Sequence, residues 1–404
     1  MKTVMIIAGG TWQVPLIKKV KSKGYKVVNT NLYKNSEGFK YADIYEVADV
    51  LDKERNLKIA KKYHVDAILT DQSDIAVPTV AFVAQETGCP SIGTEIAQLF
   101  TNKYKMRKFC AEKGFKTPEY KLCLEKKEAK EFLENLGATA IMKPLDSQSS
   151  RGVFTIKNPE EIEQYFEATK SFSQDKKSVL IERYISGPEF TVDGIVINGK
   201  HHTLAISEKT HFSYNKNIAS KLYFTYDNST YDYSKLRREH DKLVNSTGLK
   251  FGLTHTEYKY SDGEFYLIEM AARGGGTKIS SDIVPFMSGV DNYDYLIEYA
   301  LGNMQQDNLP DEIPEKYRKR TAILEFLDIE SNGKTVADIE GEDEITKIKE
   351  VADFHLEFSV GDKIKRANDD RSRIGYFIIL AEDKEIADQI EKRVKNILKI
   401  KYKE

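Results

Sequence analysis

The chain has 404 residues, of which 40% are hydrophobic and 31% are charged, and its formal net charge is -2. A chain of this length exceeds the size at which a single hydrophobic core stops growing, so we expect two or three domains. The near balance of 61 Lys and Arg against 63 Asp and Glu leaves no broad basic field, which argues against nucleic acid as a partner.

The three cysteines, Cys89, Cys110 and Cys123, lack metal-ligand spacing and are too few for a disulfide framework. This usage favours a reducing compartment, and we expect a cytoplasmic protein. The opening MKTVMIIAGG is too short for the core of a signal peptide and fits a first buried strand. No apolar stretch approaches the length needed to span a membrane, so we expect no membrane association.

Residues 1–98 alternate between strand and helix patterns. Short apolar runs predict strands at 3–8, 25–29, 44–48 and 66–70. Apolar residues at helical spacing predict helices at 14–20, 53–63 and 75–86. Strands that alternate with helices in this way indicate a doubly wound parallel sheet.

The first predicted strand ends in the turn Gly9-Gly10-Thr11. Ligands of doubly wound sheets bind at the carboxyl ends of the strands, so we expect Gly10, Thr11 and Asp74 to line a substrate cleft. A tight turn and a helix N-cap would account for these residues equally well. The GxGxxG spacing of a dinucleotide site is absent, which argues against dinucleotide binding.

The rest of the chain has a mixed α+β pattern. We predict a helix at 101–113, strands at 138–143 and 153–157, three β runs between 179 and 209, and a helix at 233–245. The polar and aromatic run 208–217 shows no clear element, as expected of a mobile loop over a site or of a surface loop. A proline-bearing linker near 303–320 leads to strands at 321–329, 353–358 and 375–380 and to an amphipathic helix at 384–398.

Two glutamates, Glu257 and Glu269, lie on either side of a predicted turn in LTHTEYKYSDGEFYLIEMAARGGG. Oxygen ligands on adjacent strands suit Mg²⁺, which usually shares its sites with phosphates. Side chains alternate faces along a strand, so the two carboxylates share a face only if the loop has an odd residue count. A three-residue loop at 261–263 places Glu257 diagonal to Glu269 and His255 opposite Glu269. A two-residue Asp-Gly turn points the carboxylates to opposite faces.

Two solvated glutamates at a sheet edge are the alternative to a metal site. The neighbouring Leu267 and Ile268 read as sheet core, so we expect the second carboxylate to sit deep. Arg273 and the glycines that follow it are placed to reach a phosphate or a developing oxyanion. The segment 275–281 lacks the GxxxxGK[ST] spacing, which excludes a P-loop.

Two further segments carry candidate nucleotide contacts. Lys143 ends an apolar strand before the Ser/Gly loop 146–152, whose small residues let backbone N–H groups approach a phosphate. The run VLIERYISGPEF combines a buried strand with extended backbone at 183–185, which can pair with an adenine edge, and it delivers Glu189 toward two ribose hydroxyls. A surface strand end and an ordinary strand–turn–strand are the alternatives.

Taken in order, these motifs resemble the ATP-grasp superfamily over about residues 99–300. The resemblance rests on Lys103, on KP at Lys143-Pro144, and on SSRGV, ERYISGPEFTVDG, HTEYKY and EMAARGGG. Residues 1–98 resemble that superfamily's preATP-grasp domain. The tail, with GDKI near Gly361, is similar to the C-terminal domain of bacterial L-amino-acid ligases.

The resemblance implies three domains: a preATP-grasp domain at 1–98, a two-subdomain ATP-grasp domain at 99–305 and a small α+β C-terminal domain at 306–404.

The resemblance also implies ATP and Mg²⁺ as cofactors, with Mn²⁺ as a substitute. The residues it assigns to ATP are Lys103, Lys143, Ser149, Ser150, Gly152, Val153, Glu182, Tyr184, Ile185 and Glu189. Glu257 and Glu269 would bind the metal. Many members carry an asparagine where this chain has Ala271, so a second metal would have one ligand fewer.

The implied activity is an ATP-dependent carboxylate–amine ligase that works through an acyl phosphate and releases ADP and phosphate. Arg273 would face the reacting carboxylate and, with the backbone N–H of Gly274 or Gly275, stabilise the oxyanion. Asp74 would take the α-amino group of an amino-acid substrate. A one-carbon ligase of nucleotide biosynthesis and a non-catalytic ATP-sensing module are the alternatives. A homodimer is common among such proteins.

Overall fold

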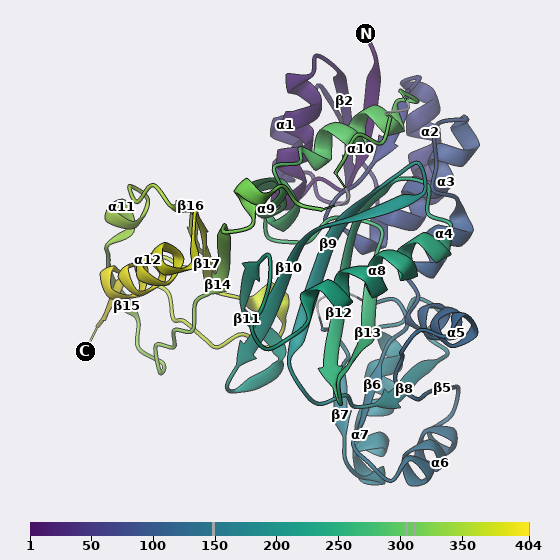
Figure 1. Cartoon of the computed structure of the whole chain (residues 1–404), viewed down its shortest axis with the longest axis vertical. Helices are drawn as coiled ribbons and strands as arrows, with labels where there is room; N and C mark the ends of the chain where they lie inside the picture. The colour runs from purple at the N-terminus through teal and green to yellow at the C-terminus, as the bar shows by residue number, and fades with distance from the viewer. Residues whose placement is uncertain (148–149, 304–305, 311, 404) are drawn as a thin grey trace.

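The first hundred residues fold as a four-stranded parallel sheet in the order β3-β2-β1-β4. Figure 1 draws this region in purple and blue. The computed structural model describes residues 1–147, 150–303, 306–310 and 312–403. The four strands are β1 (Thr3–Ile7), β2 (Lys26–Asn31), β3 (Ile44–Val47) and β4 (Ala67–Leu69). The helices of this region are α1 (Val14–Ser22), α2 (Lys53–Lys62), α3 (Val77–Thr87) and α4 (Thr94–Leu99). The predicted doubly wound parallel sheet is confirmed.

A small lobe follows, with a four-stranded antiparallel sheet in the order β5-β8-β6-β7. The helix α5 (Lys103–Lys113) leads into this lobe, whose elements are β5 (Tyr120–Cys123), α6 (Lys126–Leu136), β6 (Ala140–Lys143), β7 (Phe154–Ile156), α7 (Pro159–Ser171) and β8 (Val179–Arg183). The lobe sheet and its two helices α6 and α7 enclose a hydrophobic core of their own, which includes Met142, Phe166 and Ile181. We call residues 115–185 the β5–β8 lobe.

The largest sheet has eight strands in the order β13-β12-β9-β10-β11-β14-β17-β16. Its central strands are β9 (Glu189–Ile197), β10 (Lys200–Phe212), β11 (Asn215–Thr225), β12 (Gly252–Ser261) and β13 (Glu264–Ala271), with α8 (Tyr233–Thr247) packed against β10. The run 208–217 therefore belongs to the β10–β11 hairpin, and its prediction as a loop was wrong. The run is mostly polar, which is why it showed no strand pattern. Two buried residues anchor the hairpin, Phe212 within the run and Ile218 just after it.

The same sheet continues into the C-terminal region, because β14 pairs with β11. The strands there are β14 (Thr321–Phe326), β16 (Val351–Leu356) and β17 (Gly375–Ala381), and the amphipathic helix is α12 (Lys384–Ile397). The short α11 (Glu342–Ile345) and a separate two-stranded ribbon of β15 (Val336–Glu340) and β18 (Lys399–Tyr402) were not predicted. The sheet thus crosses the predicted boundary near residue 305, and the domain limits stay a prediction.

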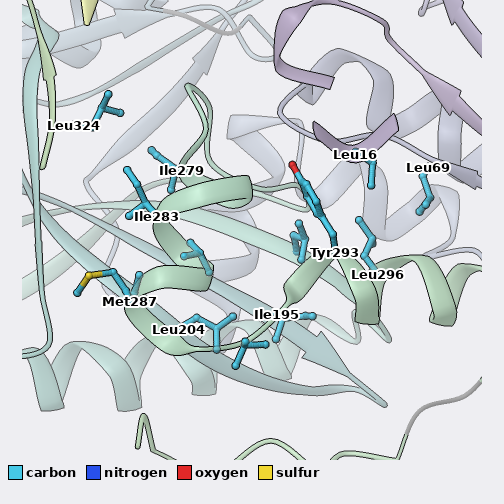
Figure 2. Packing of buried hydrophobic residues seen from close by; sticks show 14 of the residues in the cluster. Leu16, Leu69, Ile195, Leu204, Ile279, Ile283, Met287, Tyr293, Leu296 and Leu324 are labelled. Carbon is cyan, nitrogen blue, oxygen red and sulfur yellow. The ribbon is translucent and has the colours of Figure 1, made fainter. Parts of the chain in front are cut away.

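One hydrophobic core joins the parallel sheet, the large sheet and the C-terminal region (Figure 2). It brings together Leu16 and Leu69 of the first region, Ile195 and Leu204 of β9 and β10, and Leu324 of β14. The helical segment after β13 completes it, with Ile279 and Ile283 in a π-helical turn and with α9 (Val284–Ser288) and α10 (Asn292–Ala300). Three of the four regions are therefore fixed to one another, whereas the β5–β8 lobe has a separate core.

None of the helices in the described ranges has the length and apolar character that crossing a membrane requires.

Candidate functional site

A cleft of about 580 Å³ lies where the parallel sheet, the large sheet and the C-terminal region meet. Its lining includes Gly10 and Asp74 from the first region, Glu257, Glu269 and Arg273 from β12 and the end of β13, and Arg371 and Arg373 from the C-terminal region. Thr11, predicted to line this cleft, is exposed and is not among its lining residues. The two neighbours Gly10 and Trp12 line it instead.

Glu257 and Glu269 are direct partners in the β12–β13 ladder. The turn between these strands has two residues, Asp262 and Gly263, because Ser261 pairs with Glu264. The predicted three-residue loop was therefore wrong. A two-residue turn alone would put the carboxylates on opposite faces, but the register shifts by one residue between Glu257 and Tyr258. This β-bulge inserts an extra residue in β13 and returns both carboxylates to the same face.

The bulge changes two further details of the prediction. His255 pairs with Ala271, not with Glu269, and its Nδ1 lies 2.8 Å from Asp193 Oδ1. The side chain of Glu269 is 33% exposed and that of Glu257 is 25% exposed, so the second carboxylate is not the deeper one. Both line the cleft and face incoming ligands.

Each of these carboxylates is in contact with a lysine. Lys103, at the start of α5, places Nζ 2.7 Å from Glu269 Oε1 and 2.9 Å from the carbonyl oxygen of Ser147. Lys209 of β10 places Nζ 2.7 Å from Glu257 Oε1 and 2.6 Å from Glu189 Oε1. Burial lowers the pKa of Lys209, but the two carboxylates outweigh it and the net pKa is raised. Lys209 therefore stays charged and links the predicted ribose carboxylate to the predicted metal carboxylate.

No group of three or more His, Cys, Asp or Glu side chains suited to a metal occurs in the part of the chain that the structure describes. Two facing carboxylates still fit Mg²⁺, which commonly takes only one or two protein carboxylates and completes its shell with phosphate oxygens and water. At Ala271 the side chain offers no oxygen. This donor set therefore fits a metal that arrives together with a nucleotide.

Lys143 is buried with Glu182 and Arg107. Its Nζ lies 2.6 Å from Glu182 Oε2, and the Nε of Arg107 donates to Glu182 Oε1 over 2.7 Å. Burial lowers the pKa of Lys143 to about 8, and the nearby Arg107 adds to this effect. Burial alone would raise the pKa of Glu182, but the two cations lower it overall. The Glu182 carboxylate, predicted to hold adenine, is thus already bound to Lys143 and Arg107. The backbone at 183–185 remains our predicted adenine contact.

That backbone runs from Arg183 to Ile185, between the lobe and the large sheet. The Tyr184 N–H donates to the carbonyl oxygen of Thr139 over 3.0 Å, and Ile185 is buried. Beyond it, Glu189 is 6% exposed, with Lys209 at one oxygen and His211 and Lys259 near the other. Burial would raise the pKa of Glu189, but Lys209 and the other two neighbours lower it overall. Glu189 is therefore ionised and oriented.

The predicted phosphate lid is only partly described, since Ser149 lies outside the described residues. Ser150 has φ of 58° and its hydroxyl donates to the carbonyl oxygen of Asn217 over 3.0 Å. Gly152 has φ of 73°, and a Cβ there would lie 2.6 Å from the Phe172 ring. Glycine is thus required at 152 for conformation and for space. Ser150 lines the cleft, whereas Val153 is half-buried and is not among the lining residues.

Arg273 projects from the end of β13 onto the parallel-sheet region. Its Nε and Nη2 bind the two oxygens of Asp74 at 2.9 and 2.7 Å. Burial would lower the pKa of Arg273, but Asp74 raises it overall. The structure thus uses Asp74 to orient the arginine, and the predicted contact of Asp74 with a substrate α-amino group stays a prediction.

The turn after Arg273 is fixed by Asp71, which the sequence analysis missed. The fully buried Asp71 carboxylate accepts from the Gly274 N–H over 2.8 Å and from the Ser280 hydroxyl over 2.6 Å. The Tyr293 hydroxyl donates to it over 2.5 Å. The N–H of Gly274 is therefore already hydrogen-bonded to Asp71 and does not supply the predicted oxyanion contact.

The two glycines of this turn are required for space. A Cβ at Gly274 would lie 2.3 Å from Cβ of Ser280, and one at Gly275 would lie 2.8 Å from Asp193 Oδ1. Non-glycine residues with positive φ flank the same cleft, at Gln72 (55°), Thr277 (50°) and Lys278 (61°). Such backbone conformations are costly and concentrate at functional sites. The N–H of Gly275 stays our predicted oxyanion donor.

Two family models match the chain. Residues 136–282 match the ATP-grasp domain, and residues 325–403 match the L-amino acid ligase C-terminal domain 2. The predicted resemblance is thereby confirmed in both regions, as is the predicted ATP-grasp fold with its parallel N-terminal sheet.

Solved structures with the same fold cover nearly the whole chain. The L-amino acid ligase from Bacillus licheniformis is 20% identical with a TM-score of 0.81, and the match covers 100% of this chain and 99% of that one. The biotin carboxylase domain of the 2-oxoglutarate carboxylase from Hydrogenobacter thermophilus is 18% identical with a TM-score of 0.73, covering 99% and 91%. That structure is a dimer in complex with MgADP, ADP and bicarbonate, which agrees with the expectation of ATP and Mg²⁺ for this fold.

Among curated proteins, the formate-dependent phosphoribosylglycinamide formyltransferase of Bacteroides thetaiotaomicron is 28% identical over 188 residues. The match covers 46% of this chain and 48% of that protein. The chain therefore aligns with about half the length of this relative.

Proposed function

Because the chain carries an ATP-grasp domain joined to an L-amino acid ligase C-terminal domain, we propose that it is an ATP-dependent carboxylate–amine ligase acting on amino acids. The observation that carries the proposal is the pairing of Glu257 with Glu269 across the bulge, beside Arg273, in one cleft. Three features of a phosphoryl-transfer site, namely oxygen ligands, cations and a positioned arginine, thus converge without a P-loop.

Mg²⁺, when bound by Glu257 and Glu269, would neutralise charge on the terminal phosphates of ATP. The chain's own side chains supply the rest. We assign the phosphates of ATP to Lys103, which contacts Glu269, and to Lys143 at the end of β6, and the ribose hydroxyls to the oriented Glu189. Lys103 and Lys209 now contact the metal carboxylates, so phosphate oxygens would compete with those carboxylates for the two lysines.

The reaction we propose has two steps. An oxygen of the substrate carboxylate attacks the γ-phosphorus, the bond to the β-phosphate oxygen breaks, and ADP leaves. The amine nitrogen then attacks the acyl carbon, the carbon–oxygen bond to phosphate breaks, and the amine's proton is lost to solvent. Arg273, held by Asp74 at two points, would stabilise the oxyanion of the second step together with the N–H of Gly275.

A homodimer forms part of the proposal, since the biotin carboxylase domain with this fold is a dimer. Sedimentation at twice the chain mass of 46.2 kDa would support it.

The direct test is ADP and phosphate release measured over pairs of carboxylates and amines, with the L-amino acids tested in both roles. We expect release to require one acid and one amine together, and the amide product to appear in equal amount. Stimulation only by formate or bicarbonate with a phosphorylated amine would instead identify a one-carbon ligase. ATP binding without release in any combination would identify a sensing module.

A further inference from the structure

Two arginines of the C-terminal region line the cleft together with the metal carboxylates. Arg371 and Arg373 lie in the segment between β16 and β17, directly before Gly375. This segment comes from the region that matches the L-amino acid ligase C-terminal domain, not from the ATP-grasp match. The reaction proposed above assigns no role to either arginine.

Arg373 is held rigidly. Its guanidinium lies 3.7 Å from the centroid of the Phe326 ring, its Nη2 lies 2.7 Å from Asp370 Oδ1, and Nη2 also donates to the carbonyl oxygen of Ala219 over 3.1 Å. Among the described residues no partner accepts from its Nε. Burial lowers the pKa of Arg373, and the charge of Glu257 acts on it in the opposite sense. Arg373 is thus a largely desolvated cation that faces the metal carboxylates.

Arg371 differs, because its side chain is exposed at the cleft. In the described part of the chain no carboxylate forms an ion pair with its guanidinium, and its backbone N–H donates to Asp369. Arg371 also lies close enough to Arg151 of the lid segment to lower the pKa of Arg151, an effect second to that of burial. Asp369 acts on Arg151 in the opposite sense. Two arginines from different regions therefore lie near each other beside this end of the cleft, and a bound anion would reduce their mutual repulsion.

We propose that Arg371 and Arg373 form a subsite for the carboxylate of the amine acceptor. The proposal rests on the ligase function proposed above and adds the part of the acceptor that is recognised. Planar guanidinium groups bind carboxylates through two parallel hydrogen bonds, which sets the orientation of the acceptor as well as its affinity. An acceptor held there points its amine back toward Arg273 and the metal carboxylates, which line the same cleft.

The other anions of the reaction are assigned to other cations in our proposal. The carboxylate that is activated lies, in our proposal, at Arg273, which is fixed to the parallel-sheet region through Asp74. The phosphates of ATP would meet Lys103, Lys143 and Lys209. A carboxylate on the acceptor and a phosphate of ATP share the chemistry that two arginines recognise, so the experiment must separate these two sources.

The experiment compares Arg371→Gln and Arg373→Gln with the unaltered protein, using the L-amino acids and their carboxamides as acceptors. The carboxamide has the same size but no negative charge. We expect each variant to raise the KM for the amino-acid acceptor ~10- to 100-fold, the loss typical of a charge-assisted hydrogen bond. The KM values for ATP and for the acyl donor should change less than about twofold, and activity with carboxamides should fall far less than activity with the acids.

Lys365→Gln is the matched control, because Lys365 is an exposed cation of the same segment that does not line the cleft. Arg371 is the decisive position, since its exposed side chain can be replaced without disturbing the packing around Phe326. A rise in the KM for ATP with an unchanged KM for the acceptor would assign the arginines to phosphate and overturn the proposal. Retained preference for acids over carboxamides in both variants would overturn it as well.

The subsite can also be tested without turnover. Calorimetric titration of the protein with MgADP present, using the same amino acids and carboxamides, should show binding of an acid that Arg371→Gln weakens. If no acid and amine pair releases ADP but this charge-dependent binding is seen, the ligase function fails and the subsite stands. If the protein releases ADP with acid and amine pairs, but acids and carboxamides bind equally well and have the same KM as acceptors, the subsite fails and the ligase function stands.

Discussion

On the side of the cleft toward the β5–β8 lobe, the predicted metal ligand Glu269 is matched by Lys103, and the predicted adenine ligand Glu182 is buried outside the cleft lining against Lys143. At the end formed by the C-terminal region, Arg371 has no such partner among the described residues, although Arg373 is paired with Asp370. At the first end, acidic and basic side chains are already paired. A ligand that brings both a cation and an anion, such as a metal–nucleotide complex, can bind both kinds of side chain. The second end is suited to a simple anion.

The largest effect that this comparison predicts concerns the metal carboxylates. Glu257→Gln or Glu269→Gln should lower the rate of phosphate release by ~10³-fold or more, because metal stabilisation of phosphoryl charge is worth several kcal/mol. Glu264→Gln is the control, since Glu264 lies at the turn of the same hairpin and pairs with Lys235. Phosphate release by the Glu269 variant within tenfold of the unaltered protein would remove the metal from this end of the cleft.

Arg273 should come next. Arg273→Ala is expected to lower turnover ~10²- to 10³-fold, the cost of losing one oxyanion donor, while the affinity for ATP stays the same. ATP binding is measured by calorimetry and turnover by ADP release. Arg238→Ala, an exposed arginine of α8, serves as the control. A large loss of ATP affinity with little change in turnover would show that Arg273 belongs to the nucleotide and not to the reacting carboxylate.

Asp71 should have a smaller effect, because it acts through the backbone of Gly274. Asp71→Asn is expected to reduce kcat ~10- to 100-fold, as for other groups that orient a reacting residue, with the KM for ATP unchanged. Asp66→Asn gives a comparison just before the start of the same strand β4, where Asp66 binds Lys2 and the N–H of Thr3. If kcat survives while the melting temperature falls, Asp71 is structural only.

The smallest expected effect is a pH dependence of the affinity for ATP, caused by Lys143, which is paired with Glu182. Burial lowers the pKa of Lys143 to about 8 in the ligand-free protein, so its charge is present below that pH and is lost above it. The affinity for ATP should therefore weaken by up to ~10-fold between pH 7 and pH 9, since about a tenth of the lysine is protonated one unit above its pKa. Lys143→Arg should flatten this dependence, because arginine keeps its charge. An unchanged slope in that variant would place the titrating group elsewhere.

The sequence was sufficient for the features that local patterns encode. The four strands and the helices α1 to α3 of the first region and the helix at 384–398 were predicted within a few residues of their observed bounds, whereas α4 was not predicted. The convergence of Glu257 and Glu269 was also expected, but for a wrong reason. No sequence signal marked the bulge at Ile268, because a bulge depends on how β13 pairs, and a two-residue Asp-Gly turn by itself predicts the opposite geometry.

What the sequence did not reveal are partnerships over long separations. Asp71 holds Gly274, which lies 203 positions away, and only the shared core of the two regions brings them together. Lys209 was predicted at the end of a β run and at the start of a run without a clear element. Nothing in this pattern linked it to its two acidic partners, Glu189 on the neighbouring strand β9 and Glu257 on β12, one strand further. The only feature in the sequence that pointed to Lys209 was a lysine among polar residues. Such lysines are common at protein surfaces, so this feature did not predict a role for Lys209.

The separate core of the β5–β8 lobe has a consequence for motion. The parallel sheet, the large sheet and the C-terminal region share one hydrophobic core, and backbone hydrogen bonds between β11 and β14 join the last two. A hinge between those regions would have to break a sheet. A rotation of the lobe would leave its own interior intact and would have to change only the contacts at its border, such as the ion pair of Arg107 with Glu182. We therefore expect any movement that opens or closes the cleft to be made by the lobe, against a wall on the other side that the shared core holds fixed.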